Sequence, residues 1–256
     1  MMPLIFNPSI AKSKPTNSDK CPFCDIDHLD KLLEKKDEFI WLENKYRTLE
    51  NSFQTIIIES NDHFGDISNY SYEYNRELFS FALSKLFELL NSCKYKSVAM
   101  FKNFGELSGG SLRHPHLQIV GFENEDIYAE IKEQNFIGME VPLGSDNLSK
   151  INISLEPIMG FCEFNITTHK GSYLGDFSDN IKDVVMYLVN DYFSGKCNSY
   201  NIFFYVIKEQ IICKIIPRFV VSPYFVGYRM AQINNFTRLS EIKEEFLIMK
   251  GEKNEK

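Results

Sequence analysis

The sequence predicts an α+β fold in which one unit of strands and a helix occurs twice. Two observations support this prediction. Strand-like and helix-like segments follow each other in the same order in both halves of the 256 residues. The segment His-Phe-Gly-Asp-Ile-Ser at 63–68 also has a local echo, Gly-Asp-Phe-Ser, at 175–178. A duplicated unit predicts two sheets that pair into one larger antiparallel sheet with helices on one side.

The first half supplies the elements of this unit in order. Prolines and polar residues predict an extended arm over residues 1–20. A β-branched run predicts a strand at 54–59, and apolar residues at helical spacing predict a helix at 72–93. Strands are then expected at 97–103 and 116–122.

The second half repeats the order. A strand is expected at 162–168, an amphipathic helix at 179–193, and a hairpin over 200–208 and 210–216. A Gly/Ser/Asn-rich stretch at 142–150 marks the expected boundary between the halves. We therefore expect four parts, which are an extended arm at 1–20, a first half at 21–141, a second half at 151–248 and a frayed tail at 249–256.

Composition excludes several classes of function. A net charge of −7 argues against broad binding of nucleic acid, because such binding needs a basic surface. No run approaches the roughly 20 apolar residues of a membrane-spanning helix, and the start does not read as a signal peptide. Six cysteines in a chain of this length do not form a disulfide framework. We therefore expect a cytoplasmic protein with no membrane or nucleic-acid partner.

The segment 101–120 is the most informative part of the chain. It predicts a strand, then a Gly/Ser loop, then a second strand that opens with two histidines. Gly109 and Gly110 allow backbone N–H groups to approach a ligand closely, which suits phosphate oxygens.

Three polar residues start the second of these strands. Residues two apart share one face of a strand, so His114, His116 and Gln118 are expected to point the same way. The alternative is a solvent-exposed strand face on which the histidines have no function. It leaves Pro115 and the glycine loop unexplained, so we favour a functional site.

Cys21-Pro-Phe-Cys24 has the spacing of half a tetrahedral zinc site. Two further ligands must come from elsewhere, and His28 is near in sequence, whereas His63 follows the strand expected to neighbour His114. There are two rival interpretations, a glutaredoxin-type redox pair and a chance match of four residues. The redox motif needs a strand immediately before it, and the preceding residues are polar and turn-like.

Several of these motifs together resemble a known family. They occur in order as Cys21-x-x-Cys24, Asn44-Lys45-Tyr46, His63 and the run from Asn103 to Gln118. Over about residues 20–123 the chain resembles the galactose-1-phosphate uridylyltransferase branch of the histidine-triad (HIT) superfamily. The resemblance implies a HIT-like fold and suggests a homodimer.

The resemblance also implies a role for each matched residue. It places zinc on Cys21, Cys24, His63 and His114, makes His116 the nucleophile, and gives Gln118 and Ser111 to the transferred phosphoryl group. Gly110 is a further expected substrate-binding residue. Asn44, Tyr46, Ile56 and Asn103 would line the nucleoside pocket. The implied substrates are small nucleotides, either a nucleoside diphosphate (NDP) sugar or a dinucleoside polyphosphate.

The chemistry of the two central side chains agrees with nucleotidyl transfer. A neutral imidazole at His116 can attack the α-phosphorus and so divide one displacement into two. The amide of Gln118 can donate hydrogen bonds to phosphoryl oxygens but has no pKa useful for acid–base work. This combination favours transfer or phosphorolysis over hydrolysis.

The chain also departs from the family pattern. It is shorter than a full uridylyltransferase, and Asn7, Ser9, Lys12 and Lys14 stand where the family has an arginine-rich signature, which leaves hexose specificity open. The acceptor phosphate has four candidate partners, although packing or surface charge explains each equally well. These are Lys214, Arg218, Tyr228 and Arg229. A non-catalytic nucleotide sensor is the alternative function, and thiol redox chemistry is the third.

Overall fold

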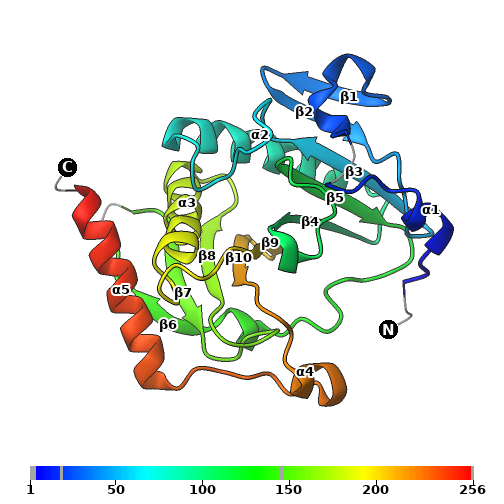
Figure 1. The fold of residues 1–256 in the computed structure, drawn as a ribbon. Coiled ribbons are helices and arrows are strands. Elements are labelled where there is room, and N and C mark those ends of the chain that lie inside the picture. The colour runs from blue at the N-terminus through cyan, green and yellow to red at the C-terminus, as the bar shows by residue number, and fades with distance from the viewer. Residues whose placement is uncertain (1–3, 18–19, 145–146, 255–256) are drawn as a thin grey trace.

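The structure, a computed structural model that describes residues 4–17, 20–144 and 147–254, is built on one ten-stranded sheet (Figure 1). The strand order is β1-β2-β3-β5-β4-β9-β10-β8-β7-β6, and all neighbouring strands are antiparallel. The predicted α+β class with a large antiparallel sheet is confirmed.

The elements have the following bounds. The strands are β1 (Leu32–Lys36), β2 (Phe39–Glu43), β3 (Ser52–Ile58), β4 (Ser97–Phe104), β5 (His116–Phe122), β6 (Gly138–Val141), β7 (Lys150–Ser154), β8 (Phe164–His169), β9 (Tyr200–Ile207) and β10 (Gln210–Pro217). The α-helices are α1 (Pro8–Lys12), α2 (Tyr72–Asn91), α3 (Gly175–Asn190), α4 (Pro223–Tyr228) and α5 (Phe236–Asn254). Short 3₁₀ helices are η1 (Pro22–Cys24), η2 (Ile26–His28), η3 (Glu106–Ser108) and η4 (Glu133–Phe136).

The strand order shows the duplication directly. The first half places β5 between β3 and β4, and the second half places β10 between β8 and β9. Each half adds a hairpin at its outer edge, β1-β2 on one side and β6-β7 on the other. The halves join where β4 pairs with β9, with Asn103 opposite Asn201. The predicted duplicated unit is therefore confirmed.

Both long internal helices cover the same face of the sheet. Figure 1 shows α2 and α3 side by side on that face, and Arg76 Nε of α2 donates a 2.8 Å hydrogen bond to Asp179 of α3. Their apolar stripes, which include Phe79 and Ile181, are fully buried. No helix in the described parts of the chain combines the length and apolarity needed to cross a membrane.

Four expectations from the sequence need correction. The expected extended arm contains α1, because Pro8 begins a helical turn and the Asn7 side chain accepts hydrogen bonds from the Ser9 and Ile10 amides. Helix α3 begins at Gly175, earlier than expected, since Phe177 in its first turn is buried in the core.

The other two corrections concern connections and the C-terminus. Helix α5 continues to Asn254, so the expected frayed tail is largely helical, and Phe246 packs that helix against Phe164 and Tyr187. The stretch 142–150, of which 145–146 lie outside the described residues, connects the paired strands β6 and β7 and is therefore part of a hairpin.

Candidate active site and metal centre

A cavity of about 580 Å³ lies on the sheet face opposite α2 and α3. It lies over the first half of the sheet, and β2, β3, β4 and β5 form its floor. The structure brings all predicted substrate-binding and catalytic residues to this one cavity, which is lined by Asn44, Tyr46, Ile56, Asn103, Gly110, Ser111, His116 and Gln118.

Strand alternation explains why the catalytic candidates reach the cavity. His116 and Gln118 of β5 line it, whereas Leu117 and Ile119 between and after them are fully buried on the helix side. Gln118 is flanked in the sheet by Ile56 of β3 and by a phenylalanine of β4. Apolar side chains of β3 and β4 therefore flank the polar side chains that β5 presents to the cavity.

The His116 ring is held in one tautomer. Its Nδ1 lies 2.8 Å from the carbonyl oxygen of His114. A carbonyl only accepts hydrogen bonds, so Nδ1 carries the proton and Nε2 keeps its lone pair. Burial lowers the pKa of His116 to about 4, and the ring is therefore neutral near pH 7. This is the protonation state that a nucleophilic imidazole requires.

The glycine loop after β4 is fixed by the second half of the chain. Gly105 has φ +81°, and a Cβ there would lie 2.3 Å from the carbonyl oxygen of Asn198, so this turn requires glycine. The Leu107 amide then donates to Ser199 Oγ at 3.2 Å. Gly109 is left-handed at φ +85° and leads the backbone along the cavity wall.

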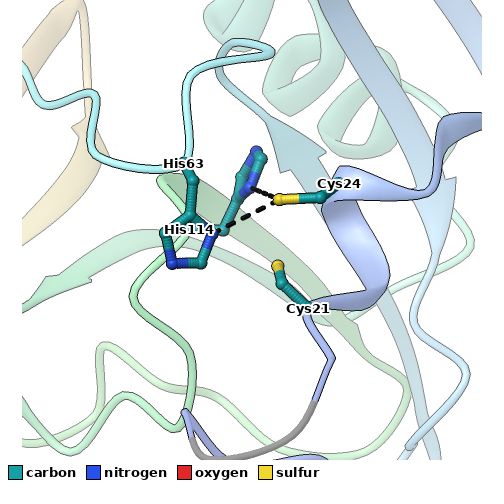
Figure 2. Close-up of side chains that lie close together, drawn as sticks. All are labelled: Cys21, Cys24, His63 and His114. Atoms are coloured by element: carbon teal, nitrogen blue, oxygen red, sulfur yellow. Dashed lines mark hydrogen bonds between the residues drawn. The ribbon is translucent and has the colours of Figure 1, made fainter.

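A second cluster adjoins the cavity. Figure 2 shows Cys21, Cys24, His63 and His114 pointing toward one centre, and their ligand atoms all lie within 4.8 Å of one another. Cys24 Sγ lies 3.4 Å from the Nδ1 atoms of both histidines. Ligand atoms around a tetrahedral zinc ion are about 3.5 Å apart, so the donor set and its spacing fit zinc.

The orientation of His114 suits a metal ligand. Its Nε2 lies 2.9 Å from the Ser60 carbonyl oxygen, which fixes the proton on Nε2 and leaves Nδ1 toward the cysteines. The Phe23 ring, inside the Cys-Pro-Phe-Cys turn, packs on both His114 and His116 with ring centroids 5.8 and 5.3 Å apart. The cysteine–histidine cluster and the cavity therefore share one wall.

His28 does not join this cluster. Its side chain is exposed and its Nδ1 lies 2.6 Å from Asp25. Of the two ligands left open by the sequence, the structure therefore brings His63 to the cysteine pair.

Buried charges lie behind the two histidines. Lys102 of β4 donates a 2.6 Å hydrogen bond to Glu59, and both side chains are excluded from solvent on the helix side of the sheet. Burial raises the pKa of Glu59, and the Lys102 ammonium opposes this shift. The Glu59 amide donates to the carbonyl oxygen of Pro115 at 3.1 Å. This pair therefore anchors the segment that carries Ser60 beside His114.

In the second half, side chains fill the sheet face that carries the cavity in the first half. Lys214 of β10 lies there fully buried, and its ammonium donates to Glu163 and Ser154 at 2.8 Å each. Phe136 of η4 covers it, with the ammonium 5.4 Å from the ring centroid. This packing removes Lys214 from the candidates for an acceptor phosphate.

The remaining acceptor candidates have different surroundings. Arg218 donates to Asn201 at 2.7 Å. Tyr228 is exposed and Arg229, beside it, packs on Phe225 at the end of α4. None of these three lines the cavity.

Sequence reasoning missed several residues around the site. Lys14 lines the cavity, and among the described residues its ammonium has no hydrogen-bond or ion-pair partner. Only its place in the arm was visible in the sequence. Phe23 carried a signal, because it is the central apolar residue of the cysteine motif. No sequence signal marked the Ser60 carbonyl or Asn201, since each contacts a site residue that is distant in the sequence.

Two protein-family models each match about one half of the chain. The profile described as "Domain of unknown function (DUF4931) N-terminal domain" matches residues 6–125, and that of the DUF4931 C-terminal domain matches 128–247. The crystal structure of a DUF4931 family protein from Bacillus cereus is 36% identical to this chain, with a TM-score of 0.77. It covers 86% of this chain and 99% of its own. No curated protein matches.

Two more distant structures share the fold. A structure of uridylyltransferase is 13% identical with a TM-score of 0.69, and covers 91% of this chain and 93% of its own. An ADP-glucose phosphorylase from Arabidopsis thaliana with bound ADP-glucose is 15% identical with a TM-score of 0.70. The match covers 94% of this chain and 93% of the phosphorylase chain. The resemblance to the uridylyltransferase fold is thus confirmed, and at these identities it concerns the fold alone.

The metal centre gives the first testable expectation. The chain should bind one zinc ion, and Cys21→Ser or His63→Ala should lower both the zinc content and the melting temperature, because a structural metal contributes to folding. Metal analysis after dialysis, together with thermal unfolding, measures both. His28→Ala is the matched control and should change neither. A metal-free preparation of full stability, or zinc lost from His28→Ala but kept by His63→Ala, would contradict the assignment.

Proposed function

We propose that this chain, which belongs to the DUF4931 family, transfers a nucleoside monophosphate from a nucleotide donor to a second small molecule. The transfer proceeds through a covalent intermediate on His116. The donor is an NDP-sugar or a dinucleoside polyphosphate, and the acceptor is inorganic phosphate or a sugar phosphate. The ADP-glucose bound in the phosphorylase of the same fold supports this class of donor.

One observation carries the proposal. His116 is neutral, its Nδ1 hydrogen bond leaves Nε2 free, and the ring lines the same cavity as Gln118. Nε2 attacks the α-phosphorus, a P–N bond forms, and the P–O bond to the leaving phosphate breaks. The acceptor phosphate oxygen then attacks the same phosphorus and releases His116. The leaving phosphate needs no proton to depart and the acceptor phosphate needs no base to attack, which agrees with Gln118 rather than an ionisable group at that position.

The cavity also offers donors for a nucleotide. Asn44 accepts a hydrogen bond from the Tyr46 amide through Oδ1 at 2.8 Å, which leaves its NH₂ group for the ligand. Gly110 and Ser111 of the loop line the same cavity as His116 and offer polar groups to a ligand there. Apolar side chains such as Leu42 and Ile56 provide a surface for a base.

Lys14 supplies the positive charge in this arrangement. Its ammonium lies close enough to His116 to contribute to the lowered pKa of that ring. The arm is tethered before and after Lys14, by a hydrogen bond from the Asn7 amide to the Thr48 carbonyl and by one from the Arg113 amide to the Asn17 side chain. We infer that Lys14 binds the phosphate beyond the one attacked by His116.

Zinc would have a structural role in this mechanism. Cys21, Cys24, His63 and His114 would hold it, and when bound it would fix the turn that carries Phe23 against His116. The reacting groups are then supplied by the chain itself, through His116, Gln118 and the loop.

Replacing the nucleophile tests the proposal. His116→Asn should abolish a trapped nucleotide adduct and reduce turnover by several orders of magnitude, while zinc content and nucleotide affinity remain largely intact. The wild-type adduct should be labile in acid and survive alkali, as a phosphoramidate does and a serine phosphoester at Ser111 does not. Near-normal turnover by His116→Asn would refute the transferase and favour a nucleotide-sensing protein.

Gln118 should control the choice between transfer and hydrolysis. Gln118→His places an ionisable group near the leaving oxygen and should raise the share of product derived from water. The ratio of water-derived to phosphate-derived product measures this. An unchanged ratio would mean that Gln118 does not face the phosphoryl group.

The role of Lys14 has a control in the same arm. Lys14→Met should raise the KM for a diphosphate donor about tenfold or more and leave the affinity for a nucleoside monophosphate nearly unchanged. Lys12→Met removes an exposed charge two residues away and should change neither. Equal effects of the two variants would show that Lys14 acts only through overall charge.

A further inference from the structure

A row of polar side chains crosses the sheet from the first half to the second. Asn103 of β4 lines the cavity with His116 and pairs in the sheet with Asn201 of β9. Arg218, directly after β10, lies at the far end of this row. The row thus connects the cavity of the first half to a guanidinium of the second half.

The hydrogen bonds along the row have a fixed direction. Arg218 can only donate, so its NH1 group, 2.7 Å away, requires Oδ1 of Asn201 to face it. The Asn201 Nδ2 group must then face the other way, where it donates to Asn103 Oδ1 at 2.6 Å and to the Ser108 carbonyl oxygen at 3.0 Å. Since the Ser108 carbonyl oxygen only accepts, both ends of the row demand the same orientation.

This direction determines what Asn103 offers to a ligand. Its Oδ1 is occupied by Asn201, so its Nδ2 group is the remaining hydrogen-bonding end. Among the described residues, that Nδ2 group has no hydrogen-bond partner. Without the row, the amide of Asn103 could turn over at small cost and present its oxygen, which would repel a phosphoryl group.

We propose that Asn201 and Arg218 are positioning residues that hold the Asn103 NH₂ group toward the phosphoryl group bound at His116, a role that differs from the nucleoside contact implied for Asn103 by the family resemblance. The second half thereby determines the polarity of a donor in the catalytic cavity of the first half. Asn201 also ties Ser108, and with it the start of the glycine loop, to the same row. Asn201 is almost fully buried, so it acts through Asn103 and not by touching the substrate. This inference rests on the proposed transfer reaction only for its catalytic consequence.

The orientation itself can be tested without any substrate. In Asn201→Asp the carboxylate still accepts from Arg218 but cannot donate, so the Asn103 NH₂ group should turn toward the new carboxylate. Side-chain amide NMR signals of Asn103, identified by their loss in Asn103→Ala, should exchange rapidly with water in the wild type and slowly in Asn201→Asp. Protected signals already present in the wild type would overturn the proposal, whatever the protein's activity.

The catalytic consequence is tested by a double-mutant cycle on donor turnover. Asn201→Asp should lower kcat at least about tenfold with a smaller change in KM, and should add little in the Asn103→Ala background. Asn165→Asp is the matched control, because that buried amide also donates two hydrogen bonds but in the second half, so kcat should not change. Additive effects of the Asn201 and Asn103 changes would overturn the positioning role. A wild type without turnover would instead refute the transfer reaction, and the NMR measurement alone would then decide the orientation of Asn103.

Discussion

Two backbone carbonyls determine how the histidines of the site can act. The Ser60 carbonyl holds Nε2 of His114, and the His114 carbonyl holds Nδ1 of His116. Each bond places the proton on one ring nitrogen and aims the other nitrogen, in His114 at the cysteine cluster and in His116 at the cavity. One short segment thereby supplies one histidine to the candidate metal site and one to the candidate active site. Displacing either carbonyl would alter both the tautomer and the direction of a ring.

The two halves differ in how the sheet face opposite α2 and α3 is occupied. In the first half it remains a cavity with His116 and Gln118 on its floor. In the second half a fully buried Lys214–Glu163 pair occupies that face, under η4. Breaking such a buried pair would leave an unpaired buried charge, which is costly. This face of the second half therefore serves packing and leaves no room for a ligand at Lys214. Its contribution to the site is made across the β4–β9 junction, through side chains such as Asn201.

Local sequence patterns were enough to predict which residues of β5 lie together in the cavity. Strand alternation and the His-Pro-His-x-Gln run were enough to place His116 and Gln118 together, because both lie on one strand, β5. Residues that meet across strands were harder to find. The link from Arg218 through Asn201 to Asn103 joins the residue after β10 to the strands β9 and β4, and no sequence period reports such pairing. The outer hairpins, β1-β2 and β6-β7, were not predicted. β1 lacks an apolar alternation, and β2, β6 and β7 are only four or five residues long.

The central claim is that His116 carries the nucleotide. The most direct measurement is the intact mass of the protein after incubation with UDP-, ADP- and GDP-sugars and dinucleoside tetraphosphates, followed by peptide mapping under alkaline conditions. The protein should gain one nucleoside monophosphate per chain from one class of donor, and the adduct should map to the peptide that contains His116. An unmodified mass with every donor that the protein demonstrably turns over, or an adduct mapped to another residue, would contradict it.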